Sequence, residues 1–201
     1  MRSRPPIAAL AALVLGLVPA AARAQNPPEW GVRGGLSISS LHGGRGSFDS
    51  KLGVVAGAFG VYDLATDFRL EGDALFTMKG ARDNNPAVSN AFVILDYVET
   101  MILARYDLPT DSAVIPHFVF GPTAAILVSG RYRGDSFGSR PLPGTWTIES
   151  GLAAGAGIDL GAGSHKVVLD ARYVLGISPA FRNSIGDARN GVLTLTGGVT
   201  F

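Results

Sequence analysis

Apolar and polar residues alternate with a period of two along most of this chain. Over Phe68–Lys79, one set of alternate positions is apolar or small, and the other carries most of the charges. Because residues i and i+2 project from one face of a β-strand, this segment predicts a strand with one apolar and one charged face. We expect eight such strands, at Trp30–Ser39, Leu52–Tyr62, Phe68–Lys79, Phe92–Tyr106, Ile115–Ser129, Trp146–Asp159, Lys166–Gly176 and Gly191–Phe201. The pattern therefore predicts an all-β fold.

The composition excludes several classes of protein. Charged residues make up 16% of the chain, against about 25% in ordinary soluble domains, and the mean hydropathy is +0.27. Such a chain is too apolar to be intrinsically disordered, and it has no basic stripe that could bind nucleic acid. The absence of cysteine excludes a disulfide scaffold, a thiolate zinc site and a cysteine nucleophile.

The first residues have the features of a secretory leader. Arg2 and Arg4 precede an apolar run at Ile7–Ala22, and Ala22-Arg23-Ala24 is a small-x-small cleavage pattern. A membrane anchor is the alternative, but the run is shorter than the roughly 20 residues of a spanning helix and contains Pro19. We expect a signal peptide at residues 1–24 and one barrel domain at residues 25–201.

The connections between the expected strands alternate in length. Long polar connections are expected at Ser40–Lys51, Gly80–Ala91, Gly130–Gly144 and Ile177–Asn190, and shorter turns at Asp63–Asp67, Asp107–Val114 and Gly161–Ser164. Outer-membrane barrels have short periplasmic turns and long extracellular loops, and their strands need about 9–11 residues to cross the bilayer. We therefore expect an eight-stranded antiparallel up-and-down transmembrane β-barrel in the bacterial outer membrane of a Gram-negative cell. Both termini fall on the short-turn, periplasmic side.

Alternation alone does not distinguish a membrane barrel from a soluble lipocalin-like, ligand-binding barrel. The chain contains only three lysines (Lys51, Lys79 and Lys166), whereas a soluble exterior carries many charges of both signs. The polar face is rich in glycine and serine, which suits a narrow interior. The terminal Phe201 resembles the C-terminal signal that barrel-assembly machinery recognises. These features favour lipid on the outside, with a soluble barrel as the alternative.

Several segments resemble the PorT-like outer-membrane β-barrel family of small eight-stranded proteins. The resemblance rests on Trp30-Gly31-Val32-Arg33-Gly34-Gly35-Leu36, Tyr97-Val98-Glu99 with Ala104-Arg105-Tyr106, Pro116–Pro122, Gly155-Ala156-Gly157-Ile158, and Arg172-Tyr173 with Gly176. Met101 stands where a proline is usual in that family. The matching residues build the barrel and carry no shared catalytic set. The resemblance implies an envelope location, with an association with secretion machinery for one founding member.

Twelve charged residues have the phase of the barrel interior, six of each sign. They form the predicted lumen charge network: Arg33, Arg69, Glu71, Asp73, Lys79, Glu99, Arg105, Glu149, Asp159, Lys166, Asp170 and Arg172. Such charges could form an ion or proton path, or they could pair into a plug. Because an eight-stranded interior is nearly filled by side chains and the signs balance, the sequence favours the plug.

No pattern of residues predicts a catalytic, metal or cofactor site. The sharpest enzyme hypothesis is an outer-leaflet lipid-modifying barrel that uses His42 and Ser47, but no orienting third group is evident. We instead expect a non-enzymatic monomer with a structural or surface-interaction role. Its expected partners are outer-membrane lipid, barrel-assembly machinery during biogenesis, and an envelope protein that binds the long loops. The third loop offers the most contact residues, namely Arg131, Tyr132, Arg133, Asp135 and Phe137.

Overall fold

The computed structural model describes residues 27–42, 48–83, 91–135, 138–141, 148–162, 165–179 and 188–201. Its strands are β1 (Glu29–His42), β2 (Phe48–Asp63), β3 (Phe68–Asp83), β4 (Ala91–Asp107), β5 (Val114–Gly134), β6 (Gly138–Pro141), β7 (Ile148–Ala162), β8 (His165–Gly176) and β9 (Arg189–Thr200). Within these residues, no helix has both the length and the apolar character needed to span a membrane. The expected signal peptide, Ser47, Phe137 and Trp146 lie outside the described residues.

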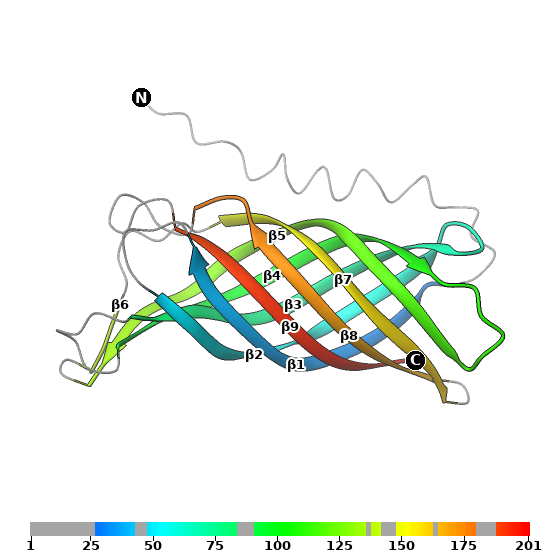
Figure 1. The fold of residues 1–201 in the computed structure, drawn as a ribbon, viewed down its shortest axis with the longest axis horizontal. Helices are drawn as coiled ribbons and strands as arrows, with labels where there is room; N and C mark the ends of the chain where they lie inside the picture. The colour runs from blue at the N-terminus through cyan, green and yellow to red at the C-terminus, as the bar shows by residue number, and fades with distance from the viewer. Residues whose placement is uncertain are drawn as a thin grey trace, which may run out of the picture.

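Eight of the strands form a closed antiparallel barrel (Figure 1). Each long strand pairs with its neighbours in the chain, β5 pairs with β7, and β1 closes the ring by pairing with β9. The additional strand β6 pairs only with the end of β5, so the two form a hairpin that extends from the barrel wall. The expected fold class is confirmed. The barrel has a terminus end, which carries Trp30 and Phe201, and an opposite loop end, which carries the β5–β6 hairpin.

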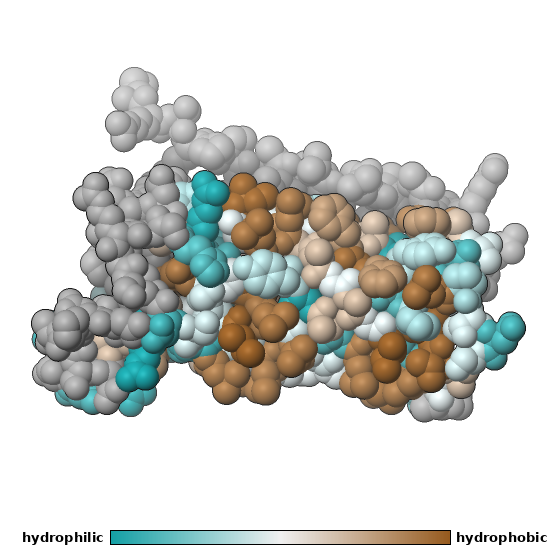
Figure 2. Space-filling view, viewed as in Figure 1, coloured by the Kyte–Doolittle hydropathy of each residue, from teal (hydrophilic) through white to brown (hydrophobic). Residues whose placement is uncertain are grey.

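The two faces of the barrel wall differ in polarity. Exposed apolar side chains such as Leu36, Phe120, Leu169 and Leu195 point outward, and charged residues such as Glu71 are buried inside. In Figure 2 the brown apolar surface covers much of the visible wall between the two ends. A soluble lipocalin-like barrel has the opposite arrangement, because it holds an apolar ligand inside and faces water outside. The lipocalin-like alternative is therefore wrong for this chain.

Most strands extend further toward the loop end than expected. His42, expected in a loop, is the last residue of β1, and Lys51 lies within β2. The expected third loop, Gly130–Gly144, is partly wrong, because Gly130–Gly134 belongs to β5 and Gly138–Pro141 forms β6. The polarity of these segments predicts loops, but a strand that continues beyond the bilayer can be polar on both faces.

A β-bulge in β5 explains why its polarity pattern changes near the loop end. Asp96 of β4 lies opposite Ser129, but Tyr97 lies opposite Leu127, so Val128 is an extra residue in the ladder. A bulge of one residue exchanges the faces of all residues beyond it. As a result Arg131 and Arg133 share the outer face with Ile94, while Tyr132 packs against the interior core.

Candidate functional site: the lumen and the loop end

Glu71 of β3 is the centre of an ion-pair network in the terminus half of the lumen. Its Oε1 accepts hydrogen bonds from Arg33 at 2.8 Å and from Arg172 at 2.6 Å, and its Oε2 lies 3.3 Å from Arg105. These four side chains are almost completely buried. Alternation brings them together, because each occupies an inward position on a different strand of a narrow barrel.

Asp73 and Asp170 complete the charge balance around these arginines. Asp73 pairs with Arg172 at 3.0 Å and with Arg33 at 3.3 Å. Asp170 pairs with Arg33 at 3.2 Å and with Arg172 at 3.0 Å. Each guanidinium therefore faces several carboxylates, the arrangement that a buried charge needs.

His117 of β5 lies inside this network, which the sequence analysis did not anticipate. Its Nε2 is 2.9 Å from Asp170 Oδ1, and its Nδ1 is 3.4 Å from Asp159 Oδ1. The position of His117 in the alternation could have predicted that it faces the lumen, because Phe118 and Phe120 have the opposite phase and face outward. The sequence analysis also did not place Asp107 in this network. Its carboxylate accepts a hydrogen bond from Arg105 Nε at 2.7 Å.

A second, smaller polar cluster occupies the loop half of the lumen. Lys79 Nζ lies 2.9 Å from Glu99 and 3.6 Å from Glu149, and all three side chains are buried. Asn190 donates a hydrogen bond to Glu149 at 2.8 Å, and Tyr97 interacts with the same carboxylate. The space among these residues does not admit a water molecule.

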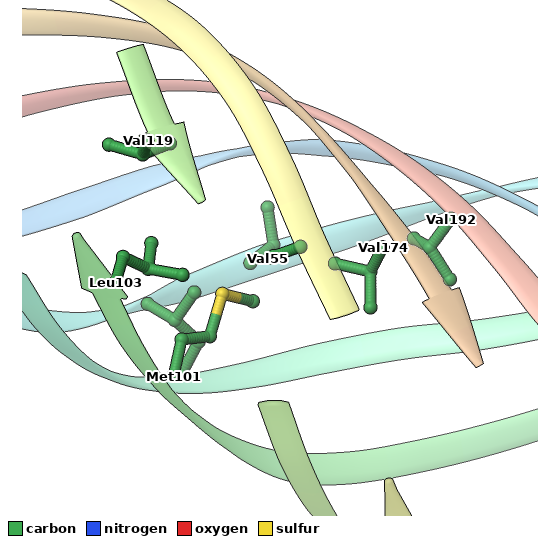
Figure 3. Packing of buried hydrophobic residues seen from close by; sticks show 8 residues of the cluster. Val55, Met101, Leu103, Val119, Val174 and Val192 are labelled. Carbon is green, nitrogen blue, oxygen red and sulfur yellow. The ribbon is translucent and has the colours of Figure 1, made fainter. Parts of the chain in front are cut away.

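An apolar layer separates the two polar clusters. Met101 and Leu103 lie between Glu99 and Arg105 along β4. Leu75 likewise lies between inward-facing charged residues along β3. Figure 3 shows Met101, Leu103, Val55 and Val119 gathered in the interior. Val174 and Val192 extend this layer. The described lumen is therefore filled by two sets of ion pairs with hydrocarbon between them.

The two remaining residues of the predicted network lie at the terminus end. Arg69 pairs with Asp63 at 3.0 Å and with Asp107 at 3.1 Å, and it is partly accessible to solvent. Lys166 pairs with Glu29. Each of the twelve residues thus makes an ion pair, ten of them in the buried interior and these two at the rim.

The enzyme hypothesis names His42 as a catalytic residue. His42 Nε2 lies 2.8 Å from Ser40 Oγ in an exposed position, and no described carboxylate orients the imidazole. No group of three or more potential metal-binding side chains occurs among the described residues. The proposed nucleophile Ser47 lies outside these residues.

The loop end presents a different surface on β5 and β6. Arg131 Nη2 lies 3.1 Å from Asp96 Oδ2 on the outer wall, where the Arg131 side chain is 51% exposed. Beyond it, Arg133 and Asp135 are exposed, and Arg140 of β6 lies opposite Tyr132. Arg131, Tyr132, Arg133 and Asp135 are among the expected contact residues, but a strand hairpin holds them instead of a loop.

The solved structures that resemble this barrel include three bacterial proteins. Ail, the attachment invasion locus protein of Yersinia pestis, solved with the heparin analogue sucrose octasulfate, is 17% identical with a TM-score of 0.47, over 88% of this chain and 100% of that chain. Neisserial surface protein A is 17% identical with a TM-score of 0.48, over 87% and 98%. Outer membrane protein W of E. coli is 14% identical with a TM-score of 0.48, over 88% and 100%. Nothing about function transfers at this level of similarity.

The comparison with protein families gives a direct assignment. No curated protein matches the sequence. The family model described as outer membrane protein beta-barrel domain matches residues 23–182, which is most of the chain. The closed barrel and its apolar outer wall agree with that match. This chain belongs to the outer membrane protein β-barrel domain family.

Proposed function

We propose that this protein is a non-enzymatic barrel with a structural or surface-interaction role in the cell envelope. In this proposal both termini face the periplasm, and the loop end faces the outside of the cell. The PorT-like resemblance adds a finer hypothesis, in which the partner is an envelope protein of a secretion apparatus. The barrel acts as a monomer, and Phe201 serves as its signal for the assembly machinery.

The filled lumen is the observation that carries this proposal. Buried ion pairs occupy both halves of the interior, and the apolar layer around Leu103 lies between them. Ions would have to pass between these apolar side chains, which is energetically costly. A conducting or transporting role through the lumen is therefore disfavoured, and the outer surfaces are left as the site of function. The lumen charge network then has a structural role, as a plug.

The β5–β6 hairpin is the best-defined contact surface. Its four paired positions extend the barrel wall and hold exposed side chains on a rigid support, which is how barrel scaffolds present binding residues. Replacing residues 134–138 by Asn-Gly would keep the Arg133–Ser139 pair and close the hairpin with a two-residue turn. We expect the shortened barrel to fold. We expect it not to crosslink to the envelope protein that crosslinks to the wild type.

A control variant changes the opposite end of the barrel. Thr110 and Asp111 lie in the turn between β4 and β5, and replacing both by glycine should leave the crosslinked partner unchanged. If the shortened hairpin retains the same crosslinked proteins as the wild type, the contact surface has been assigned wrongly.

The orientation can be tested because the chain contains no cysteine. A cysteine at Ser139 in β6 should react with a membrane-impermeant maleimide on intact cells, whereas one at Asp111 should react only after lysis. The reverse labelling pattern would place the termini outside the cell and overturn the proposed orientation.

The lipid-modifying alternative rests on the Ser40–His42 contact. If this contact were catalytic, the wild-type protein would remove or transfer an acyl chain of outer-leaflet lipids. The lipids of cells with His42→Ala would keep that chain. We expect no acyl difference between cells with the wild type, with His42→Ala and without the gene, measured by mass spectrometry of extracted lipid.

A further inference from the structure

A groove of about 650 Å³ lies on the outer wall at the loop end. Its lining residues come from four neighbouring strands and from the turn after β5. They are Ser50, Lys51, Leu52, Arg82, Phe92, Ile94, Arg133 and Asp135. The lumen clusters do not account for this groove, and the proposed contact surface of the β5–β6 hairpin shares only Arg133 and Asp135 with it.

The groove carries an excess of positive charge. Lys51, Arg82 and Arg133 line it against the single carboxylate of Asp135. Asp49, opposite Arg82 in the β2–β3 ladder, is the other nearby carboxylate on that side. Arg133 makes no ion pair with any residue of the described ranges. One guanidinium in the groove is thus available for an anionic ligand.

The carboxylate beneath the groove is already neutralised. Asp96 is buried on the outer wall, where Arg131 pairs with it at 3.1 Å and Lys51 lies close enough to interact electrostatically. Arg82 lies over the ring of Phe92, 5.9 Å from its centroid. The groove therefore combines cations with an aromatic surface.

Two irregularities of the sheet bring these residues to the outside. The bulge at Val128 turns Arg131 and Arg133 outward, and the β2–β3 register shifts between Ser50 and Val55. Without the first bulge, Arg131 and Arg133 would continue the inward phase of Leu127. The sheet thus diverts these cations from the lumen to the surface that meets the membrane.

The wall below the groove is apolar. Leu52 is 63% exposed, and Val54, Ile126 and Val128 also present exposed side chains on these strands. Cations above an apolar surface match an anionic lipid, whose phosphate lies at the membrane interface and whose acyl chains extend into the bilayer. Arginine binds phosphate strongly because its planar donors can make paired, charge-assisted hydrogen bonds.

We propose that this groove is a binding site for a phosphate-bearing lipid of the leaflet surrounding the loop end. Arg82 and Arg133 bind the phosphate, Lys51 adds positive charge, and Leu52 and Ile94 contact the acyl chains. This site overlaps the proposed protein-contact surface at Arg133 and Asp135. The hairpin variant described above retains both arginines, so the two proposals are tested by different variants.

The test uses the purified full barrel in detergent and native mass spectrometry with bisphosphorylated lipid A as the probe. Arg82→Gln with Arg133→Gln should weaken binding by at least about tenfold, because two charge-assisted contacts are lost. Arg189→Gln is the matched control, since Arg189 is an exposed arginine at the same end on β9 and does not line the groove. It should bind like the wild type. Heat-modifiable gel mobility establishes that each variant is folded.

Two further arms identify the ligand chemistry. Dephosphorylated lipid A should bind at least about tenfold more weakly than the phosphorylated lipid, and millimolar inorganic phosphate should not displace the lipid. Equal binding of the dephosphorylated lipid would overturn the assignment of a phosphate site. Displacement by inorganic phosphate would show an anion site without lipid selectivity, and unchanged binding by a folded double variant would also overturn the proposal.

Discussion

Arg131 lies two residues beyond the ladder partner of Asp96, and its guanidinium reaches that carboxylate at 3.1 Å on the outer wall. The contact depends on the bulge, because Val128 has no residue opposite it and the faces of β5 exchange there. If β5 kept Val128 in a regular ladder, this row of cations would point into the lumen instead of toward the membrane.

Deleting Val128 should leave the barrel folded. The deletion removes the unpaired residue and makes the ladder regular, while Arg131 and Tyr132 keep their present faces. Deleting Val98 from the regular part of β4 should prevent assembly, because every residue from Ala91 to Tyr97 would exchange faces. The measurement is the fraction of each variant with heat-modifiable mobility after refolding. Similar yields for the two deletions would contradict the assignment of the bulge.

Replacing Leu169 by arginine should destabilise the barrel by about 2–4 kcal/mol if this position faces the middle of the bilayer. Leu169 is 44% exposed on the apolar outer wall of β8. Leu169→Phe keeps an apolar side chain and should cost much less. Urea unfolding in lipid vesicles, followed by tryptophan fluorescence, gives both free energies of unfolding. A stable Leu169→Arg barrel would show that this face does not meet lipid hydrocarbon.

Glu71→Gln should cost about 3–5 kcal/mol in unfolding free energy, because three buried arginines would lose a shared negative charge. Glu29→Gln is the matched change at the partly exposed rim, where Glu29 pairs with Lys166. It should cost no more than about 1 kcal/mol. Equal losses for the two variants in the same vesicle assay would mean that the interior ion pairs do not plug a dry lumen.

Gly35→Ala should impair folding, whereas Gly34→Ala should be tolerated. A Cβ at the inward-facing Gly35 would collide with the backbone carbonyl of Leu195 on the paired strand, which cannot move without breaking the ladder. A Cβ at Gly34 points outward and meets only ordinary van der Waals neighbours. Overpacking of this kind costs about 1–3 kcal/mol or more, and refolding yield at raised urea measures it. Equal yields would show that β1 and β9 can separate locally.

The sequence was sufficient to predict the eight barrel strands, the faces of their central residues and the closed barrel. A period of two fixes which residues share a face, and the lengths of the connections fix the antiparallel order. Glu71, Arg105 and Arg172 could be assigned to the lumen for that reason, since a strand position alone decides inside or outside.

The tertiary structure alone decided which of these residues meet. Strand register and bulges depend on pairing across the barrel, and no local pattern in β5 marks Val128 as the residue without a partner. His117 meets Asp159 and Asp170 because the registers of the β5–β7 and β7–β8 ladders place the three residues close together on the inner face. The outward groove of Arg82 and Arg133 likewise requires four strands to be placed side by side. Alternation is a property of one strand, whereas an ion pair or a groove is a property of several.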